Sequence, residues 1–435
     1  MEKNQFNKIL SLVSSDRLRT SNTGNGDLLI ATESDKGRVI NSASFRRLQQ
    51  KAQVFSLESN AAVRSRLTHS IEVSQLGRYL AQSIVKKAAN TDTGYRELTS
   101  FVNTVETACL LHDIGNPPFG HLGESAIKEF FSHKHSNENL SNFDGNPQGF
   151  RLVSFLNGHD SYGFNLTTSL LLSIVKYPWT YIDNPDENKI GMFTSEYPSY
   201  EMACESLKWN VGKKFPLMLL MDAADEIAYS MSDLEDGLEK KLFRIEEIKS
   251  EFGPARFERN ASINPMVNFK TSIINDLVAH AADNFTINLD EIMEGGNVKL
   301  INKKSEIGEL LSQVNNFARD NIYCHEEIEK IELSGRCVIK GLLSHFNELL
   351  VLDHDKFELL VNKDKKAIRA RKLDFESRIF NRLPWSYVEK YKEARNRCDS
   401  DEMQARQHLV VDFISGMTDD FSLETYQILE GIKIK

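Results

Sequence analysis

The chain has 435 residues, of which 40% are hydrophobic and 26% are charged, the composition of an ordinary globular protein. A formal net charge of −9 argues against a surface built throughout for nucleic-acid phosphates, although a local basic patch is compatible with it. Five scattered cysteines without a CxxC pair favour a reduced, cytoplasmic protein. The sequence lacks both a signal-peptide apolar core and an apolar run of membrane-spanning length, so no membrane association is expected.

Hydrophobic periodicity predicts an all-α protein. The segment 180–200 reads as an irregular loop, and helical patterns return after residue 245. The segment 66–88 carries an apolar stripe formed by Leu67, Ile71, Leu76, Leu80 and Ile84. In chain order, the clearest predicted helices cover residues 44–55, 66–88, 101–113, 122–131, 165–178 and 216–242.

The stretch "ACLLHDIGNPPFGHLGE", residues 108–124, contains the first chemical motif. An apolar helix ends on His112 and Asp113, and a Gly-Asn-Pro-Pro turn then stops it. His121 and Glu124 follow, one helical turn apart. Imidazole and carboxylate groups at a helix end are suited to a divalent metal, but one such pair cannot fill a site.

Two further residues complete a candidate metal site. His69 lies within a predicted helix, and Asp225 lies in the long helix 216–242. With His112 and Asp113 they supply two imidazoles and two carboxylates, which suit Mg²⁺, Mn²⁺ or Fe²⁺ better than a structural zinc site. Each residue also has a structural interpretation, because a lone histidine is more often buried and satisfied, and acids often lie on a solvated helix face.

The spacing along the long helix favours a pocket. Asp225, Tyr229 and Asp233 follow one another every four residues, so they lie along one helix face. Arg66 stands three residues before His69, on the same face. The alternative is that Tyr229 belongs to the core and the two acids flank it at the surface.

Several ordered motifs resemble the HD-domain phosphohydrolases, and more closely the bacterial deoxyguanosine triphosphate triphosphohydrolases. This resemblance implies an HD-type helical core over roughly residues 60–240, a helical C-terminal region over 245–435, and one helical unit over 1–435. The matching stretches are "ESDKGRVINSASFRRLQQKAQVF", "RLTHSIEV", "ACLLHDIGNPPFGHLGE", "MDAADEIAYSMSDLEDG" and, near the end, "DFISGMTDDF".

The resemblance implies hydrolysis of a deoxynucleoside triphosphate to the deoxynucleoside and tripolyphosphate, with dGTP as the expected substrate and one Mn²⁺ or Mg²⁺ ion (or Fe²⁺) as cofactor. His121 and Glu124 then match the catalytic histidine and its acidic companion. Arg66 and Lys189 match phosphate-binding residues, Lys189 in a loop that departs from the family pattern. The family's metal ligands fall on His69, His112, Asp113 and Asp225, and its sugar-recognition residues on Gln53, Tyr229 and Asp233.

Two alternatives remain open: another HD-domain nucleotidase or phosphodiesterase, and a non-catalytic regulator that binds nucleotide or single-stranded DNA. Relatives often assemble as hexamers, so the resemblance implies a homo-oligomer. Some relatives bind single-stranded DNA, for which the run "NKDKKAIRARK" is the candidate surface, although a solvated charged helix face explains it as well. Its basic residues are Lys363, Lys365, Lys366, Arg369, Arg371 and Lys372.

Overall fold

The computed structural model describes residues 3–22, 26–87, 94–135, 137–158, 160–185, 187–260, 262–396 and 401–433. Within these ranges the regular structure is helical, and the β-type pairing consists of two isolated bridges, Arg17 with Thr167 and Ala52 with Ser65. The all-α prediction is therefore confirmed. Across the described ranges, none of the helices combines the length and the apolar character needed to cross a membrane.

The helices of the first half are α1 (Lys3–Leu10), α2 (Leu28–Ile40), α3 (Ala43–Arg47), η2 (Leu48–Gln50), α4 (Arg66–Lys87), α5 (Tyr95–Leu111), α6 (Gly120–Lys134), α7 (Glu138–Ser141), α8 (Gly145–Arg151), η3 (Leu152–Leu156), α9 (Thr168–Ser173), α10 (Tyr197–Leu207) and α11 (Pro216–Glu239). Those of the second half are α12 (Ile245–Phe252), η4 (Pro254–Arg256), α13 (Pro265–Ile287), α14 (Leu289–Met293), α15 (Glu306–Ala318), η5 (Arg319–Tyr323), α16 (Glu326–Leu350), α17 (His354–Val361), α18 (Lys365–Ala370), α19 (Asp374–Phe380), α20 (Trp385–Arg395), α21 (Glu402–Ser415) and α22 (Asp419–Leu429).

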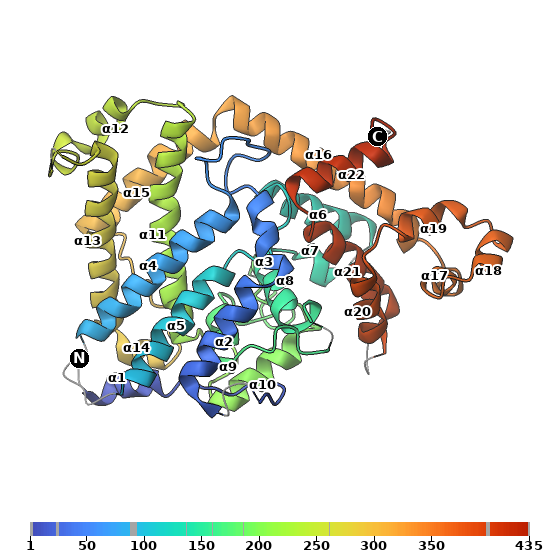
Figure 1. Cartoon of the computed structure of the whole chain (residues 1–435), viewed down its shortest axis with the longest axis horizontal. Helices are drawn as coiled ribbons and strands as arrows, with labels where there is room; N and C mark the ends of the chain where they lie inside the picture. Colours follow the sequence, from blue (N-terminus) through green and yellow to red (C-terminus); the bar gives the residue numbers. More distant parts are fainter. Residues whose placement is uncertain are drawn as a thin grey trace.

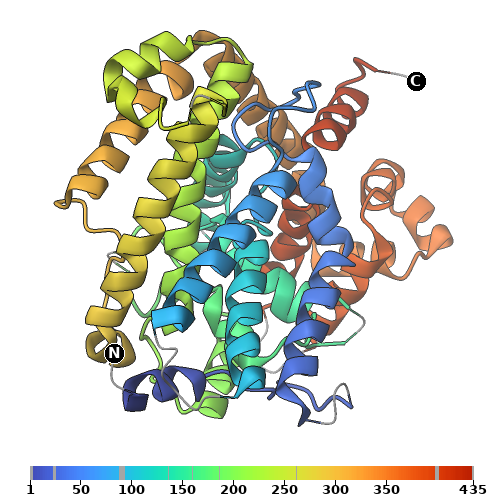
Figure 2. The same cartoon turned by 60° about the vertical axis from the view of Figure 1, so that its left-hand side comes forward.

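Four long helices, α13, α11, α4 and α5, form the central bundle and lie side by side in both views (Figures 1 and 2). α4 and α5 approach closely because Gly77 faces Cys109, and a Cβ at Gly77 would lie 2.3 Å from the Cys109 sulfur. α11 begins with Pro216 at its first turn, a position that suits proline because the missing N–H has no helical partner there. Close packing of these helices fixes the relative positions of the side chains they carry.

The buried apolar side chains form two clusters. The first fills the central bundle and includes Val105, Leu220 and Ile273. The second lies between α6 and the C-terminal helices and includes Ile339 and Phe413. α16 contributes to both and runs across the top of the molecule, whereas α17, α18 and α19 lie at its right-hand edge (Figure 1). The C-terminal region is thus packed directly on the helix that carries His121.

Three local expectations were wrong. The predicted helix over 44–55 ends at Gln50, and that over 165–178 ends at Ser173. In both cases a lysine just beyond the helix end, Lys51 or Lys176, binds groups elsewhere in the fold. Ile71 is 51% exposed, because the buried face of α4 is formed instead by Ser70, Val73, Gly77, Leu80, Ala81 and Ile84.

Candidate active site

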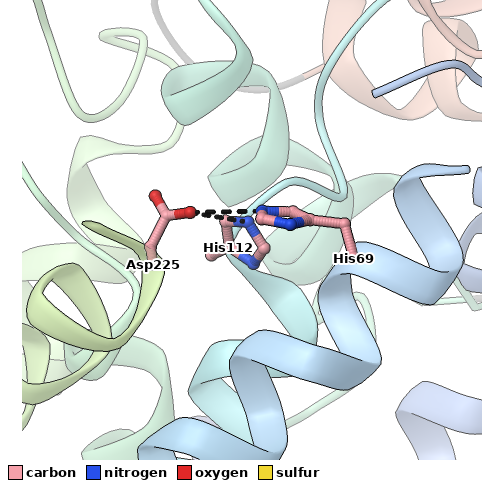
Figure 3. Close-up of side chains that lie close together, drawn as sticks. All are labelled: His69, His112 and Asp225. Carbon is pink, nitrogen blue, oxygen red and sulfur yellow. Dashed lines mark hydrogen bonds and ion pairs between the residues drawn. The ribbon is translucent and has the colours of Figure 1, made fainter. Parts of the chain in front are cut away.

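Three helices bring two imidazoles and a carboxylate together (Figure 3). His69 comes from α4, His112 directly follows α5, and Asp225 comes from α11. The Nε2 atoms of His69 and His112 lie 3.3 and 3.4 Å from the same oxygen, Asp225 Oδ1. One ligand atom of each residue lies within 4.8 Å of the others, so the three can bind one metal ion.

The hydrogen bonding of His112 suits a metal ligand. Its Nδ1 lies 2.7 Å from the backbone oxygen of Cys109, an acceptor, so Nδ1 donates this hydrogen bond and Nε2 is the nitrogen that faces the cluster. Nε2 is buried and has no hydrogen-bond partner. A buried polar atom without a partner is costly, and a divalent cation would provide one. The donor set therefore fits a divalent metal.

Asp113, predicted as the fourth metal ligand, lies outside this cluster of three and beside His112. Its Oδ2 is 3.5 Å from His112 Nε2 and only 2.6 Å from a guanidinium nitrogen of Arg66, while Asn116 donates to Oδ1 at 2.8 Å. Burial alone would raise the pKa of Asp113, but His112 and Arg66 together lower it to about 2. Asp113 is therefore ionised at neutral pH, as a metal ligand must be.

Lys176 belongs to the site, although no sequence motif pointed to it. It follows α9, and its ammonium lies 3.0 Å from Asp225 Oδ2 and 3.3 Å from Asp222 Oδ1. Burial would raise the pKa of Asp225, but Lys176 and His112 hold it well below the ordinary value.

His121 and Glu124 form a pair on the first turn of α6. Glu124 Oε2 lies 2.9 Å from His121 Nδ1, and its other oxygen accepts the Gly145 backbone N–H at 2.9 Å. The Glu124 side chain is 9% exposed whereas that of His121 is 88% exposed. The hydrogen bond that His121 donates to Glu124 raises the pKa of His121. A buried carboxylate thus orients an accessible imidazole.

The turn between Asp113 and His121 depends on close backbone packing. Gly115 lies against α8, and a Cβ there would be 2.1 Å from Gly145 O and Gly149 N. Phe119 has φ 59° and ψ 24°, a left-handed conformation that is uncommon for a bulky residue. The chain therefore reverses sharply and returns His121 to the region of His112.

One cavity of about 620 Å³ is lined by most of the predicted residues, including Gln53, whose buried Oε1 has no hydrogen-bond partner. The Lys189 ammonium is half exposed and lies 3.9 Å from Asp144 Oδ2. His69 is fully buried behind the cavity wall. The predicted residues on the wall are Gln53, Arg66, His112, Asp113, His121, Glu124, Lys189, Asp225 and Tyr229, and sequence reasoning missed Asn116, Lys176, Arg319, Tyr323 and Glu332.

Asp233 does not line this cavity. It is 1% exposed, and the hydroxyl of Tyr323 from η5 donates to its Oδ2. Its other oxygen is buried without a partner, and burial raises the pKa of Asp233 to about 6. Tyr229, one turn earlier, does reach the cavity, and Asn315 donates to its hydroxyl at 3.3 Å. Tyr323, which lines the cavity, therefore occupies one of the two oxygens of Asp233.

Comparison with protein families agrees with this geometry. Residues 66–145, which include His69, the His112–Asp113 pair and the His121–Glu124 pair, match the HD domain. Residues 378–428 match a phosphohydrolase-associated domain. The chain therefore contains an HD domain with a possible divalent-metal site, and the two matches together support a relationship to the HD-domain phosphohydrolases.

Proposed function

We propose that the chain hydrolyses deoxynucleoside triphosphates, dGTP foremost, to the deoxynucleoside and tripolyphosphate. The observation that carries the proposal is that one cavity is lined by the candidate metal ligands His112, Asp113 and Asp225, by the His121–Glu124 pair and by a set of cations. A polyanionic phosphate chain needs cations around it. Four basic side chains line this cavity: Arg66, Lys176, Lys189 and Arg319.

The reaction breaks the bond between the α-phosphorus and the sugar O5′. A divalent ion held by His69, His112, Asp113 and Asp225 would supply Lewis-acid polarisation of the α-phosphoryl group. Water adds its oxygen to phosphorus and gives up a proton, while O5′ leaves with a proton. The exposed imidazole of His121, oriented by Glu124, can exchange a proton with either oxygen.

Arg66 and Lys176 line the cavity, and each is paired with a candidate metal ligand. Arg66 is paired with Asp113 and Lys176 with Asp225, so both cations are fixed before substrate arrives. Fixed charges bind a phosphate chain with little reorganisation. Lys189, which is half exposed, supplies a more mobile cation at the cavity edge.

For the sugar, we propose that Gln53 and Asp233 bind the 3′-hydroxyl and that Tyr229 closes the space at C2′. Gln53 offers an unpartnered acceptor at the cavity wall. One oxygen of Asp233, Oδ1, also has no partner. The substrate hydroxyl would take the place of Tyr323 on this carboxylate. An aromatic wall rejects an added hydroxyl by about a hundredfold, and burying that hydroxyl unpaired costs a further ~1–3 kcal/mol.

The deciding experiment compares the four deoxynucleoside triphosphates, GTP and dideoxy-GTP with Mn²⁺ or Mg²⁺, and separates the products by chromatography. Tripolyphosphate with deoxynucleoside is the expected product pair, and dGTP the expected best substrate. Release of monophosphate or pyrophosphate would favour the alternative of another nucleotidase or phosphodiesterase. Absence of turnover with retained nucleotide binding would favour a regulator.

The same proposal includes a homo-oligomer, measured by light scattering after size exclusion, and a single-stranded DNA effector. The basic segment 363–372 lies beside exposed aromatic rings, and Lys363 and Lys392 each lie 4.3 Å from the centre of the Trp385 ring. Exposed Trp385 and Phe375 could stack on bases while the lysines neutralise phosphates. Salt-dependent binding of an oligonucleotide would support this surface, and binding unchanged in Trp385→Ala would exclude it.

A further inference from the structure

The stretch "DFISGMTDDF", residues 412–421, has no role in the mechanism above, yet it contacts two residues that line the candidate active site, Ala52 and Phe119. It contains the turn from Ser415, the end of α21, to Asp419, the start of α22. This turn is buried, with Met417 and Asp419 each 2% exposed. A buried carboxylate is stable only when it has hydrogen-bond or ion-pair partners.

The carboxylate of Asp419 binds two active-site loops at once. Its Oδ2 accepts the backbone N–H of Ala52 at 3.0 Å, and its Oδ1 accepts that of Phe119 at 3.1 Å. Ala52 directly precedes Gln53, and Phe119 stands two residues before His121. Asp419 therefore joins the loop that carries the candidate sugar ligand to the loop that carries the candidate acid–base residue.

Lys51 forms a second connection between the same three segments. Its ammonium donates to Asn116 O at 2.5 Å and to Ser415 O at 2.7 Å. Lys51 is 4% exposed, and burial lowers its pKa to about 7. Asn116 in turn donates to Asp113 Oδ1 at 2.8 Å. A chain of hydrogen bonds thus runs from the 415–419 turn to a candidate metal ligand.

Phe119 depends on an outside acceptor of this kind. It begins α6 from a left-handed conformation, φ 59°, and no side chain caps the helix start. Such a conformation in a bulky residue persists only where its surroundings fix it. The Phe119 ring packs against Gly335 of α16, where a Cβ would be 2.3 Å from the ring, and Asp419 takes up the Phe119 N–H.

We propose that Asp419 is a positioning residue of the active site: by holding the Ala52 and Phe119 amides, it sets Gln53 and His121 in register with the metal ligands. The role of Gln53 and His121 in catalysis rests on the proposed function, whereas the connection itself does not. The phosphohydrolase-associated segment would then serve to align the catalytic loops.

Asp419→Asn tests this connection with little change in volume, because an amide offers one acceptor where the carboxylate offers two. Asp420→Asn is the matched control, since Asp420 is the exposed neighbour with the same charge. Hydrogen exchange reads the connection without any substrate. In Asp419→Asn, one of the two amides, Ala52 or Phe119, loses its acceptor, and we expect exchange at that amide to accelerate about tenfold or more, equivalent to ~1.4 kcal/mol, with distant α13 amides unchanged.

Activity supplies the second readout, with metal content and thermal midpoint measured alongside. For Asp419→Asn, we expect kcat to fall about tenfold or more well below the midpoint, since a misplacement of about 1 Å can cost about a hundredfold. Unchanged exchange at both amides would overturn the proposal. A variant that fails to fold, or whose amides exchange faster throughout the protein, would also overturn it, because Asp419 would then contribute to general stability. Wild-type protein inactive on every nucleotide, with the local exchange effect present, would refute the proposed function and leave the connection standing.

Discussion

Replacing Asp225 by asparagine tests the metal centre most directly. The substitution keeps the shape of the side chain and removes the charge that faces both imidazoles. Lys176 retains Asp222 at 3.3 Å, so no buried cation is left unpaired and we expect the fold to persist. Metal binding should be lost, because a neutral amide is a poor substitute for a carboxylate at a divalent ion.

The size of the effect follows from binding linkage. A metal present at a hundred times its dissociation constant stabilises the folded state by ~2.7 kcal/mol. With an unfolding entropy of about 2.1 cal/mol/K per residue, a chain of 435 residues that unfolds as one unit has about 0.9 kcal/mol/K, so the midpoint should rise by about 3 °C. Wild-type protein should show this rise with Mn²⁺ and lose it with chelator.

The assay is thermal unfolding with and without metal, together with metal analysis after dialysis. Asp222→Asn is the matched control, because Asp222 binds the same Lys176, whereas the two imidazoles face Asp225. Asp225→Asn should show no rise and Asp222→Asn a normal one. A normal rise and full metal content in Asp225→Asn would refute the assignment of Asp225 as a ligand.

The remaining predictions concern the cavity. His121→Ala should keep its metal and its substrate binding while kcat falls by about a hundredfold or more; loss of metal would show that His121 is a ligand instead. The hydrogen bond that His121 donates to Glu124 raises the pKa of His121. The pair therefore stabilises the folded state fully below the ordinary imidazole pKa, and this contribution is lost as pH rises through the raised pKa. In Glu124→Gln, the limb of the pH–rate profile that reports His121 should therefore move to lower pH. If activity falls with rising pH along this limb, His121 acts as an acid, and if activity rises, it acts as a base. A limb that does not move would contradict the pairing of His121 with Glu124. Tyr229→Ala should bring kcat/KM for GTP closer to that for dGTP, and an unchanged ratio would remove Tyr229 from sugar selection. Tyr323→Phe should lower KM for dGTP, because Asp233 loses its competing hydroxyl donor; a higher KM would show that Tyr323 itself binds substrate.

The helices and the gathering of His69, His112 and Asp225 were within reach of the sequence. Their periodicity is strong, and the three residues lie at fixed places on helices that must pack together. Helix ends were less predictable, because tertiary partners decide them. Lys51 and Lys176 lie outside the observed helices and bind groups that are far away in the sequence. No local sequence pattern predicts such a partner.

The sugar-binding residues show a second limit. The four-residue spacing placed Tyr229 and Asp233 on one face of α11, but the structure exposes only Tyr229 to the cavity. Asp233 is covered by Tyr323, which comes from η5, 90 residues further along the chain. Sequence spacing defines the face of a helix, whereas access to that face depends on what packs over it.

The charges of the site explain why it can be ordered before a metal binds. Asp225 directs Oδ1 to the imidazoles and Oδ2 to Lys176, and Asp113 directs Oδ2 to Arg66 while its Oδ1 accepts from Asn116. Both carboxylates have lowered pKa values, so both are charged at neutral pH and already fixed in direction. A buried charge of this kind is tolerated only with a partner, and the two cations provide it. The same two cations face the cavity, so the groups that keep the metal ligands ionised are also those available to a phosphate chain. Metal binding and phosphate binding would then draw on one shared set of charges.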